Sequence, residues 1–288
     1  MGGIMAGLLS GLEQFGLGGL EGMNLYEKEA SEEIKQAVAP SAPSEQDFLF
    51  DKTQNCPICD CEFKSKTVKI GKAKLIGTDL DLRPKYENID MLKYDVISCP
   101  KCGYTSLSRY FKFLTAPQAK KIQEQITKTF KPQKETSEIY TYDQALERYK
   151  LTLANAIVKQ AKPSEKAYIC LKAAWLIRGK AEHLNVKDSN FTQQKKECED
   201  AENEFLRNAM EGFLAARQSE GYPMCGMDEC TVDYLIAVTA MRFDQYDVAS
   251  KLVSSILVSS VANPRMKEKA RDLKEMLMIK IKEQKMGK

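Results

Sequence analysis

The sequence has very little histidine, very little tryptophan and almost no net charge. Among 288 residues there are one His and one Trp, and 43 Lys and Arg residues offset 40 Asp and Glu residues for a net charge of +3. A single His leaves little for hydrolytic triads or for His-based metal catalysis, because both need a positioned imidazole. No phosphate-binding loop, nucleophile elbow or zinc-protease motif occurs either. We therefore expect a protein that is not an enzyme.

Long apolar runs and a secretory leader are also missing. No uncharged apolar run approaches the roughly 18–20 residues that a membrane span requires. The first basic residue is Lys28, so the charged region that opens a secretory leader is absent. We therefore expect a cytoplasmic protein without a membrane span. In a reducing cytosol, paired members of the nine Cys are expected to be metal ligands before disulfides.

Charge and composition divide the chain into three parts. Residues 1–50 hold two Lys and eight Asp and Glu, a net charge of −6, whereas residues 51–135 carry +7 and residues 136–288 carry +2. The predicted fold class is α+β, a small zinc-ribbon-like β segment followed by an all-α tetratricopeptide-like repeat domain. The predicted parts are an acidic, Gly-rich tail and linker over 1–47, a zinc-ribbon-like domain over 48–116 and the helical domain over 117–288.

The N-terminal tail combines many glycines with a row of apolar residues. Eight of the sixteen Gly lie in the first 22 residues, and each Gly costs about 1 kcal/mol relative to Ala inside a helix. The apolar residues are spaced as on one helical face, so the tail is a candidate docking peptide that folds only on a partner. A disordered tail without a partner is the alternative. The candidate docking residues are Leu8, Leu9, Leu12 and Phe15.

Two Cys-Pro-x-Cys units in the middle of the chain are the strongest chemical signal. They are Cys56-Pro57-Ile58-Cys59 and Cys99-Pro100-Lys101-Cys102, and the second is followed by Gly103. Two residues between thiolates allow a tight turn to aim both sulfurs at one ion, and two such turns supply the four ligands of a closed tetrahedral site. We expect one structural Zn²⁺ held by Cys56, Cys59, Cys99 and Cys102. A redox pair and an iron–sulfur cluster remain open alternatives.

The segment between the two Cys pairs is rich in β-forming and basic residues. Residues 63–76 alternate in polarity and predict strands with turns or bulges at Gly71 and Gly77, and Tyr94–Ile97 predicts another strand. Its lysines, interleaved with aromatic residues, are candidates for contact with a nucleic-acid backbone, with a solvated strand face as the alternative. These lysines are Lys64, Lys66, Lys69, Lys72 and Lys74.

From residue 117 onward the apolar spacing predicts helices. Three helices contain a small residue one turn before a larger one, which matches an element of the tetratricopeptide repeat. These pairs are Ala145–Tyr149, Ala201–Phe205 and Ala249–Val253. The helices are expected over 117–130, 145–157, 166–182, 198–217, 231–242, 245–260 and 265–284. An ordinary irregular helical domain is the alternative.

From Phe48 onward the chain resembles an uncharacterised bacterial family, domain of unknown function 2225. The resemblance rests on Leu49-Phe50-Asp51-Lys52, on the two Cys-Pro-x-Cys units and on their long separation. It covers roughly residues 48–285 and implies a bacterial cytoplasmic protein with a four-Cys zinc segment and a tetratricopeptide-like region. The resemblance implies no activity.

Two function classes fit these observations. The first is a non-catalytic, zinc-binding adaptor whose helical-repeat surface binds a protein or peptide. The alternative is a nucleic-acid-associated regulator that binds through the basic ribbon. Neither the partner nor the oligomeric state follows from the sequence.

Cys225 and Cys230 are candidates for a second metal site or a redox pair, and Asp79 and Asp81 are expected to be solvated carboxylates.

Overall fold

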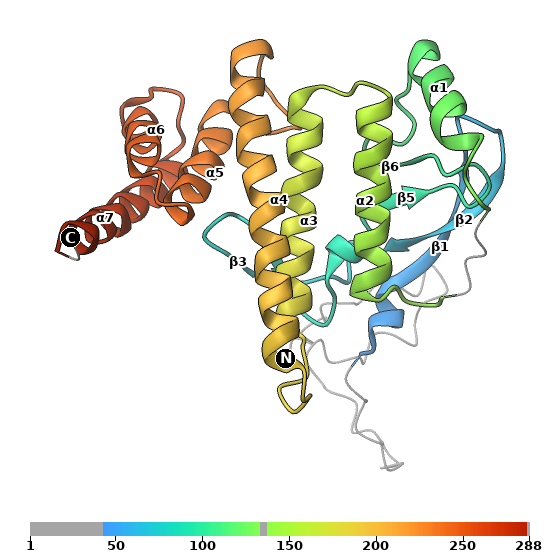
Figure 1. Ribbon diagram of the computed structural model, residues 1–288, viewed down its shortest axis with the longest axis horizontal. Helices are drawn as coiled ribbons and strands as arrows, with labels where there is room; N and C mark the ends of the chain where they lie inside the picture. The colour runs from blue at the N-terminus through green and yellow to red at the C-terminus, as the bar shows by residue number, and fades with distance from the viewer. Residues whose placement is uncertain (1–42, 133–136, 287–288) are drawn as a thin grey trace, which may run out of the picture. The chain divides into compact units, whose positions relative to one another are not determined.

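The computed structural model describes residues 43–132 and 137–286, where short strands are followed by long helices (Figure 1). This order confirms the predicted α+β class. The 3-10 turns and strands are η3 (Glu45–Phe48), β1 (Leu49–Asn55), β2 (Glu62–Val68), β3 (Leu75–Thr78), β4 (Pro84–Tyr86), η4 (Met91–Tyr94), β5 (Val96–Ser98) and β6 (Thr105–Leu107). The helices are α1 (Ala116–Ile122) with the π-helical turn η5 (Gln123–Thr127), α2 (Tyr142–Val158), α3 (Pro163–Glu182), α4 (Phe191–Ser219), α5 (Glu229–Arg242), α6 (Tyr246–Val258) and α7 (Pro264–Met286).

Within these residues the strands form three separate antiparallel pairs, β1–β2, β3–β4 and β5–β6, instead of one ribbon sheet. The stretch predicted to form strands over 63–76 does so, and the chain turns at Gly71 as predicted. The register of β3 against β4 shifts between Leu75 and Gly77, which confirms the irregularity expected at Gly77. Because β2 and β3 belong to different sheets, this segment is two hairpins and not one continuous surface.

The strand predicted from Tyr94 begins two residues later, at Val96. Tyr94 instead ends η4, because the Asp90 carboxylate accepts a hydrogen bond from the Leu92 N–H (3.0 Å) and caps a 3-10 turn there. The Tyr94 side chain is buried, and its hydroxyl donates to Glu45 at 2.7 Å. Local capping chemistry therefore overrides the strand propensity of this residue.

Capping residues set where the helices begin. Thr115 and Gln118 form a capping box at the start of α1, and Thr141 accepts from the Gln144 N–H (3.1 Å) at the start of α2. α4 starts at Phe191, earlier than the predicted residue 198. Its first turns read FTQQKKE and are largely exposed, so they show no apolar period that would indicate a helix.

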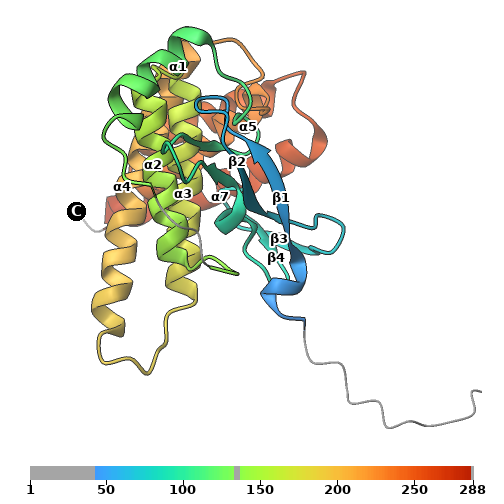
Figure 2. The same ribbon diagram turned by 90° about the vertical axis from the view of Figure 1, so that its right-hand side faces the viewer.

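The helices α2, α3 and α4 lie side by side, and the β5–β6 hairpin and η4 cover one face of this layer (Figures 1 and 2). Leu92, Val96 and Leu107 are buried in the same core as the helices. The Tyr149 hydroxyl in α2 donates to the Leu92 carbonyl at 3.1 Å. Residues 44–288 form one compact unit, and the domain boundary expected at residue 116 stays a prediction.

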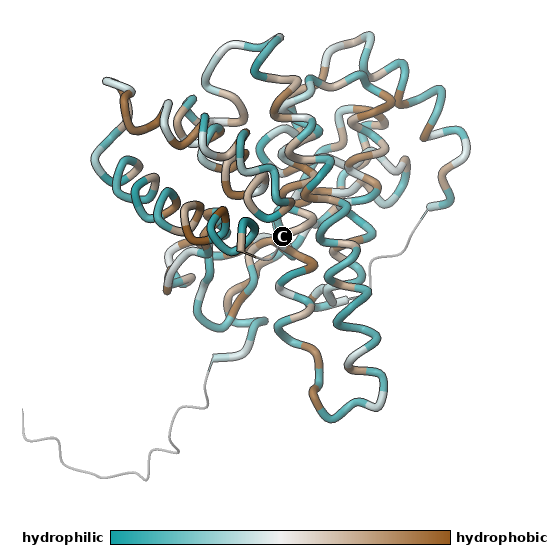
Figure 3. The backbone as a smooth tube through the Cα atoms, turned by 60° about the vertical axis from the view of Figure 1, so that its left-hand side comes forward, coloured by the Kyte–Doolittle hydropathy of each residue, from teal (hydrophilic) through white to brown (hydrophobic). Residues whose placement is uncertain are grey.

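Helix α4 packs closely on α3, and α5, α6 and α7 pack on one another. A Cβ at Gly212 of α4 would lie 2.8 Å from the Cβ of Ala167, so the glycine permits the close approach. Apolar and polar residues alternate along these helices (Figure 3). Of the predicted small–large pairs, Ala145–Tyr149 and Ala249–Val253 are buried, whereas α4 buries Ala209–Phe213 in place of the half-buried Ala201–Phe205.

The candidate docking residues Leu8, Leu9, Leu12 and Phe15 lie outside the described residues. Among the helices that the structure describes, none combines the length and apolar character that crossing a bilayer requires.

Candidate metal centre

The first pair of candidate ligands lies in the turn between β1 and β2. The Cys56 N–H donates to the Cys61 carbonyl (3.0 Å), and the Asp60 N–H donates back to the Cys56 carbonyl (3.0 Å). Asp60 closes the turn with a positive φ of 56°. The Ile58 N–H lies 3.4 Å from the Cys56 sulfur. A backbone N–H that faces a sulfur favours the thiolate form, which is the form that binds metal.

The second pair lies in the turn between β5 and β6, which repeats this pattern position by position. The Cys99 N–H donates to the Tyr104 carbonyl (2.8 Å), and the Gly103 N–H donates to the Cys99 carbonyl (3.1 Å). Gly103 has a φ of +75°, in the place that Asp60 takes in the first turn. The two turns therefore present their thiols in the same way, although they belong to different hairpins.

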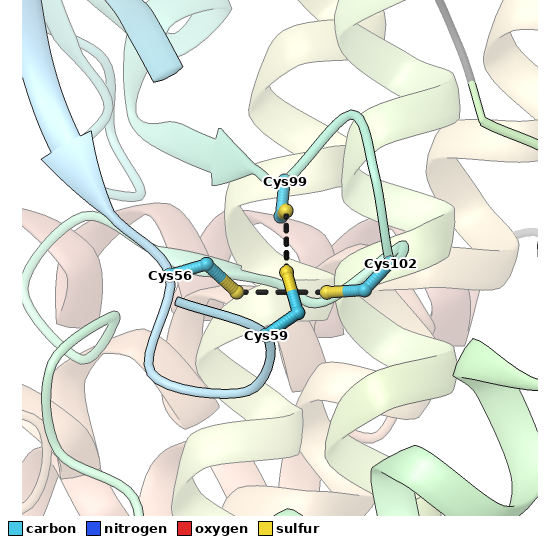
Figure 4. Close-up of side chains that lie close together, drawn as sticks. All are labelled: Cys56, Cys59, Cys99 and Cys102. Atoms are coloured by element: carbon cyan, nitrogen blue, oxygen red, sulfur yellow. Dashed lines mark hydrogen bonds between the residues drawn. The ribbon is translucent and has the colours of Figure 1, made fainter. Parts of the chain in front are cut away.

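All four sulfurs meet at one point, as Figure 4 shows. The Cys56 and Cys102 sulfurs are 3.5 Å apart, the Cys59 and Cys99 sulfurs are 3.7 Å apart, and all four lie within 4.8 Å of one another. A tetrahedral ion with metal–sulfur bonds of about 2.3 Å requires sulfurs roughly 3.8 Å apart. All nine cysteines are free thiols. The predicted ligand set therefore forms a cluster that could hold a metal ion.

The cluster is buried, and its thiols shift one another's pKa values. Cys56, Cys99 and Cys102 are at most 1% exposed, and Cys59 is half-buried. Hydrogen bonds with Cys102 and Cys56 lower the pKa of the Cys99 thiol. Hydrogen bonds with Cys56 and Cys99 raise the pKa of the Cys102 thiol. The sulfurs therefore share protons among themselves, and a divalent cation would replace those protons on binding.

Two helical segments hold the turns in place. The Gln123 side chain in η5 donates to the Ile58 carbonyl at 3.2 Å, and the Asn155 side chain in α2 donates to the Gly103 carbonyl at 3.1 Å. A Cβ at Gly103 would lie 2.5 Å from the Phe130 ring. Apolar side chains then enclose the cluster, which excludes water from the sulfurs; those fully buried are Tyr104, Phe111 and Ile122.

In the described ranges, no other group of three or more His, Cys, Asp or Glu side chains has a metal-binding arrangement. The thiols of Cys225 and Cys230 have separate partners. The Cys225 thiol donates to the Ser164 carbonyl (3.4 Å), and the Cys230 thiol donates to the Ser259 hydroxyl (3.7 Å). The structure therefore gives no support to the second metal site considered from the sequence.

The five candidate nucleic-acid lysines do not share one environment. Lys64 and Lys66 lie on β2, whereas the other three lie in the turn that leads to β3. The Lys66 ammonium pairs with Asp51 at 2.8 Å, Lys69 donates to the Asp47 carbonyl at 3.2 Å, and Lys74 pairs with Glu87 at 3.7 Å. Their contact with nucleic acid stays a prediction. The other two are Lys64 and Lys72, both exposed.

The expectation that Asp79 and Asp81 are solvated is wrong. Asp81 is 4% exposed, and its carboxylate accepts from the indole of Trp175 (2.9 Å) and pairs with Arg178 (2.6 Å). Asp79 pairs with Arg83 at 2.6 Å. The contacts of Asp81 with Trp175 and Arg178 join the β3–β4 hairpin to α3, and no local pattern reveals them because these partners lie more than 90 residues apart in the chain. We call the following set the charge network: Asp79, Asp81, Arg83, Arg178, Glu182 and Glu202.

Comparison with known proteins identifies the family of the chain. No curated protein and no solved structure matches it. A family model matches residues 49–277, the greater part of the chain and the part that contains all four clustered cysteines. The chain belongs to the family described as an uncharacterised protein conserved in bacteria, domain of unknown function 2225.

Proposed function

We propose that Cys56, Cys59, Cys99 and Cys102 hold one structural Zn²⁺. The observation that carries this proposal is the set of sulfur separations, because 3.5 and 3.7 Å fit the edges of a single-ion tetrahedron. Thiolate ligands favour zinc over harder cations such as Mg²⁺ and Ca²⁺. Four protein ligands leave no open position for water, so the metal would stabilise the fold and would not activate a substrate.

Two other uses of the four thiols fit this geometry less well. A redox pair forms its disulfide inside one Cys-x-x-Cys unit, whereas the sulfur pairs at 3.5 and 3.7 Å here join one turn to the other. An iron–sulfur cluster contains several irons, and its thiolates must therefore lie further apart than those around a single ion. Zinc would tie the β1–β2 hairpin to the β5–β6 hairpin, which belong to different sheets.

We further propose that the protein is a non-catalytic cytoplasmic adaptor whose tetratricopeptide-like helical part binds another protein. The packing of α5, α6 and α7 on one another supports a repeat-like array. Exposed apolar side chains near its end support a contact surface. They are Val258 at 83%, Val261 at 78%, Ile279 at 57%, Met278 at 51% and Met276 at 41% exposure.

Crosslinking inside a bacterium that carries this protein tests the adaptor role. A photoreactive residue in place of Met276 should give one discrete crosslinked species that is larger than the protein alone. The same residue in place of Glu268, which is exposed on the same helix, is the matched control. Equal labelling from both positions, or none from either, would contradict the adaptor role while leaving the zinc proposal intact.

A further inference from the structure

A cavity of about 530 Å³ lies between the β1–β2 hairpin and the segment that contains η4, β5 and the loop after β6. One wall includes Lys52 and Gln54 of β1, and the opposite wall includes Ile97 and Lys112. Cavities of roughly 300–1,000 Å³ are typical of sites for small molecules. Nothing in the metal centre or in the adaptor proposal uses this cavity.

The β1–β2 wall of the cavity is polar. Lys52 and Gln54 lie on one face of β1, and Ser65 stands directly opposite Lys52 on β2, so the three share that face. Gln54 is 5% exposed as a residue, and it lines the cavity. The buried Ser65 hydroxyl lacks a hydrogen-bond partner in the described part of the chain. The amide of Gln54 both donates and accepts hydrogen bonds, so this wall offers a polar contact of both kinds to a ligand in the cavity.

Uncompensated charge in the cavity is positive. Lys52 and Lys112 approach from opposite walls, are exposed, and pair with no carboxylate among the described residues. Asp95, which also lines the cavity, is paired with Lys172 and accepts from the Ser108 hydroxyl at 2.7 Å. The carboxylate of Asp90 caps η4. The two free ammonium groups therefore favour an anionic ligand.

The cavity also offers apolar surface between its charged walls. Leu92, Ile97 and Phe111 line it and are buried. Phe113 lines it too and is 76% exposed, so its ring is available to stack on a flat group. A ligand that fills this space therefore combines an anionic group, a hydrogen-bonding edge and a flat apolar face.

We propose that this cavity binds a nucleoside phosphate. Lys52 and Lys112 hold the phosphate, the Gln54 amide bonds to the edge of the base, and Phe113 stacks on the base. An amide that both donates and accepts matches the mixed edge of a nucleobase, whereas the carboxylates of an acidic peptide only accept. Two sources carry the proposed chemistry, a free nucleotide and a single-stranded RNA.

Calorimetric titration of the metal-loaded full-length protein tests this proposal. The probes are the four ribonucleoside 5′-monophosphates, the matching nucleosides without phosphate, a short single-stranded RNA and poly-glutamate. At least one monophosphate or the RNA should bind, and Lys52→Glu should weaken it on the order of tenfold or more, because an attractive charge becomes a repulsive one. Binding of a monophosphate assigns the site to free nucleotides, and binding of the RNA alone assigns it to RNA.

Two further variants separate this site from general charge. Lys64→Glu makes the same charge change on the other face of the same hairpin, and it should leave the affinity within about twofold. Gln54→Leu should reduce the preference among bases, because it removes from the cavity lining the amide that bonds to the edge of the base. No binding by any nucleotide or RNA, equal binding of the nucleosides, equal losses in Lys52→Glu and Lys64→Glu, or Lys52-dependent binding of poly-glutamate alone would each overturn the proposal.

Discussion

The four-thiol cluster and the charge network both fasten a β-hairpin to the rest of the fold, but they use different chemistry. The cluster joins two hairpins through sulfurs that an ion can bridge. The charge network joins the β3–β4 hairpin to α3 through Asp81, Arg178 and Trp175. Metal binding to preformed thiolates contributes directly to folding. A buried ion pair returns little net stability, and yet removing one partner is costly. Two sets of contacts that both fasten a hairpin can therefore differ widely in the net stability that they contribute and in the cost of losing one partner.

Removing a thiol should have the largest effect. Cys99→Ser should abolish stoichiometric zinc and unfold the β1–β2 and β5–β6 hairpins, because three thiolates no longer close the tetrahedron. Cys61→Ser is the matched control, since this thiol is next in sequence to the first turn but outside the four-sulfur cluster. Zinc content and near-ultraviolet circular dichroism measure both variants. A Cys99→Ser protein with full zinc and an unchanged spectrum would show that the cluster is not the metal site.

Breaking the charge network should cost somewhat less. Arg178→Met leaves the buried carboxylate of Asp81 and the half-buried carboxylate of Asp79 short of a partner, and a loss of about 3–5 kcal/mol in the free energy of unfolding is expected. Lys280→Met removes an exposed pair with Glu283 at 3.3 Å and should cost less than about 1 kcal/mol. Urea denaturation measures both. Equal costs would mean that the network is no more important than a surface ion pair.

The two cysteine turns allow a smaller and sharper comparison. Gly103→Ala should destabilise the fold by about 1–3 kcal/mol, because φ is positive there and the Phe130 ring lies 2.5 Å from the added Cβ. At the matching position Asp60 already carries a side chain at a φ of 56°. Asp60→Ala adds no new strain there, so it should destabilise the fold less than Gly103→Ala does. Thermal unfolding of the zinc-loaded proteins decides this. A larger loss of stability in Asp60→Ala than in Gly103→Ala would contradict this comparison of the two turns.

Acid should weaken the charge network by a small and predictable amount. Burial alone would raise the pKa of Asp79, but hydrogen bonds with Lys85 and Arg178 and the charge of Arg83 outweigh it and lower that pKa. Burial alone would also raise the pKa of Glu182, but the hydrogen bond with Arg83 and the charge of Arg83 outweigh burial and lower that pKa. The folded protein therefore binds fewer protons at these groups than the unfolded chain. Their stabilisation is present above the unfolded values of about 4 and is lost as the pH falls through the folded ones.

The only Trp in the sequence reports this change, because its carbonyl accepts from Arg83 (3.3 Å), which pairs with both Asp79 and Glu182. Its fluorescence should stay constant from neutral pH down to about pH 4 and change below it. Because acid also releases metal from thiolates, Asp79→Asn is the control, and it should reduce the pH dependence of stability below pH 4. A transition of Trp175 centred near neutral pH would contradict the assignment.

Sequence reasoning found the parts of the molecule whose signals are local. The two Cys-Pro-x-Cys units predicted which four sulfurs cluster, and apolar spacing placed most helices. It missed Asp81, because its partners Trp175 and Arg178 lie more than 90 residues away. It placed the small–large pair of α4 at Ala201, since several spacings in that helix look alike and only packing against α3 selects among them. The polar face around Gln54 likewise depends on which way the hairpin turns.

The most direct test of the central claim is X-ray absorption at the zinc edge of the purified full-length protein, combined with elemental analysis. The account predicts one zinc per chain with four sulfur neighbours at about 2.3 Å and no oxygen or nitrogen neighbour. Iron in place of zinc, a mixed sulfur and oxygen shell, or no stoichiometric metal at all would contradict it.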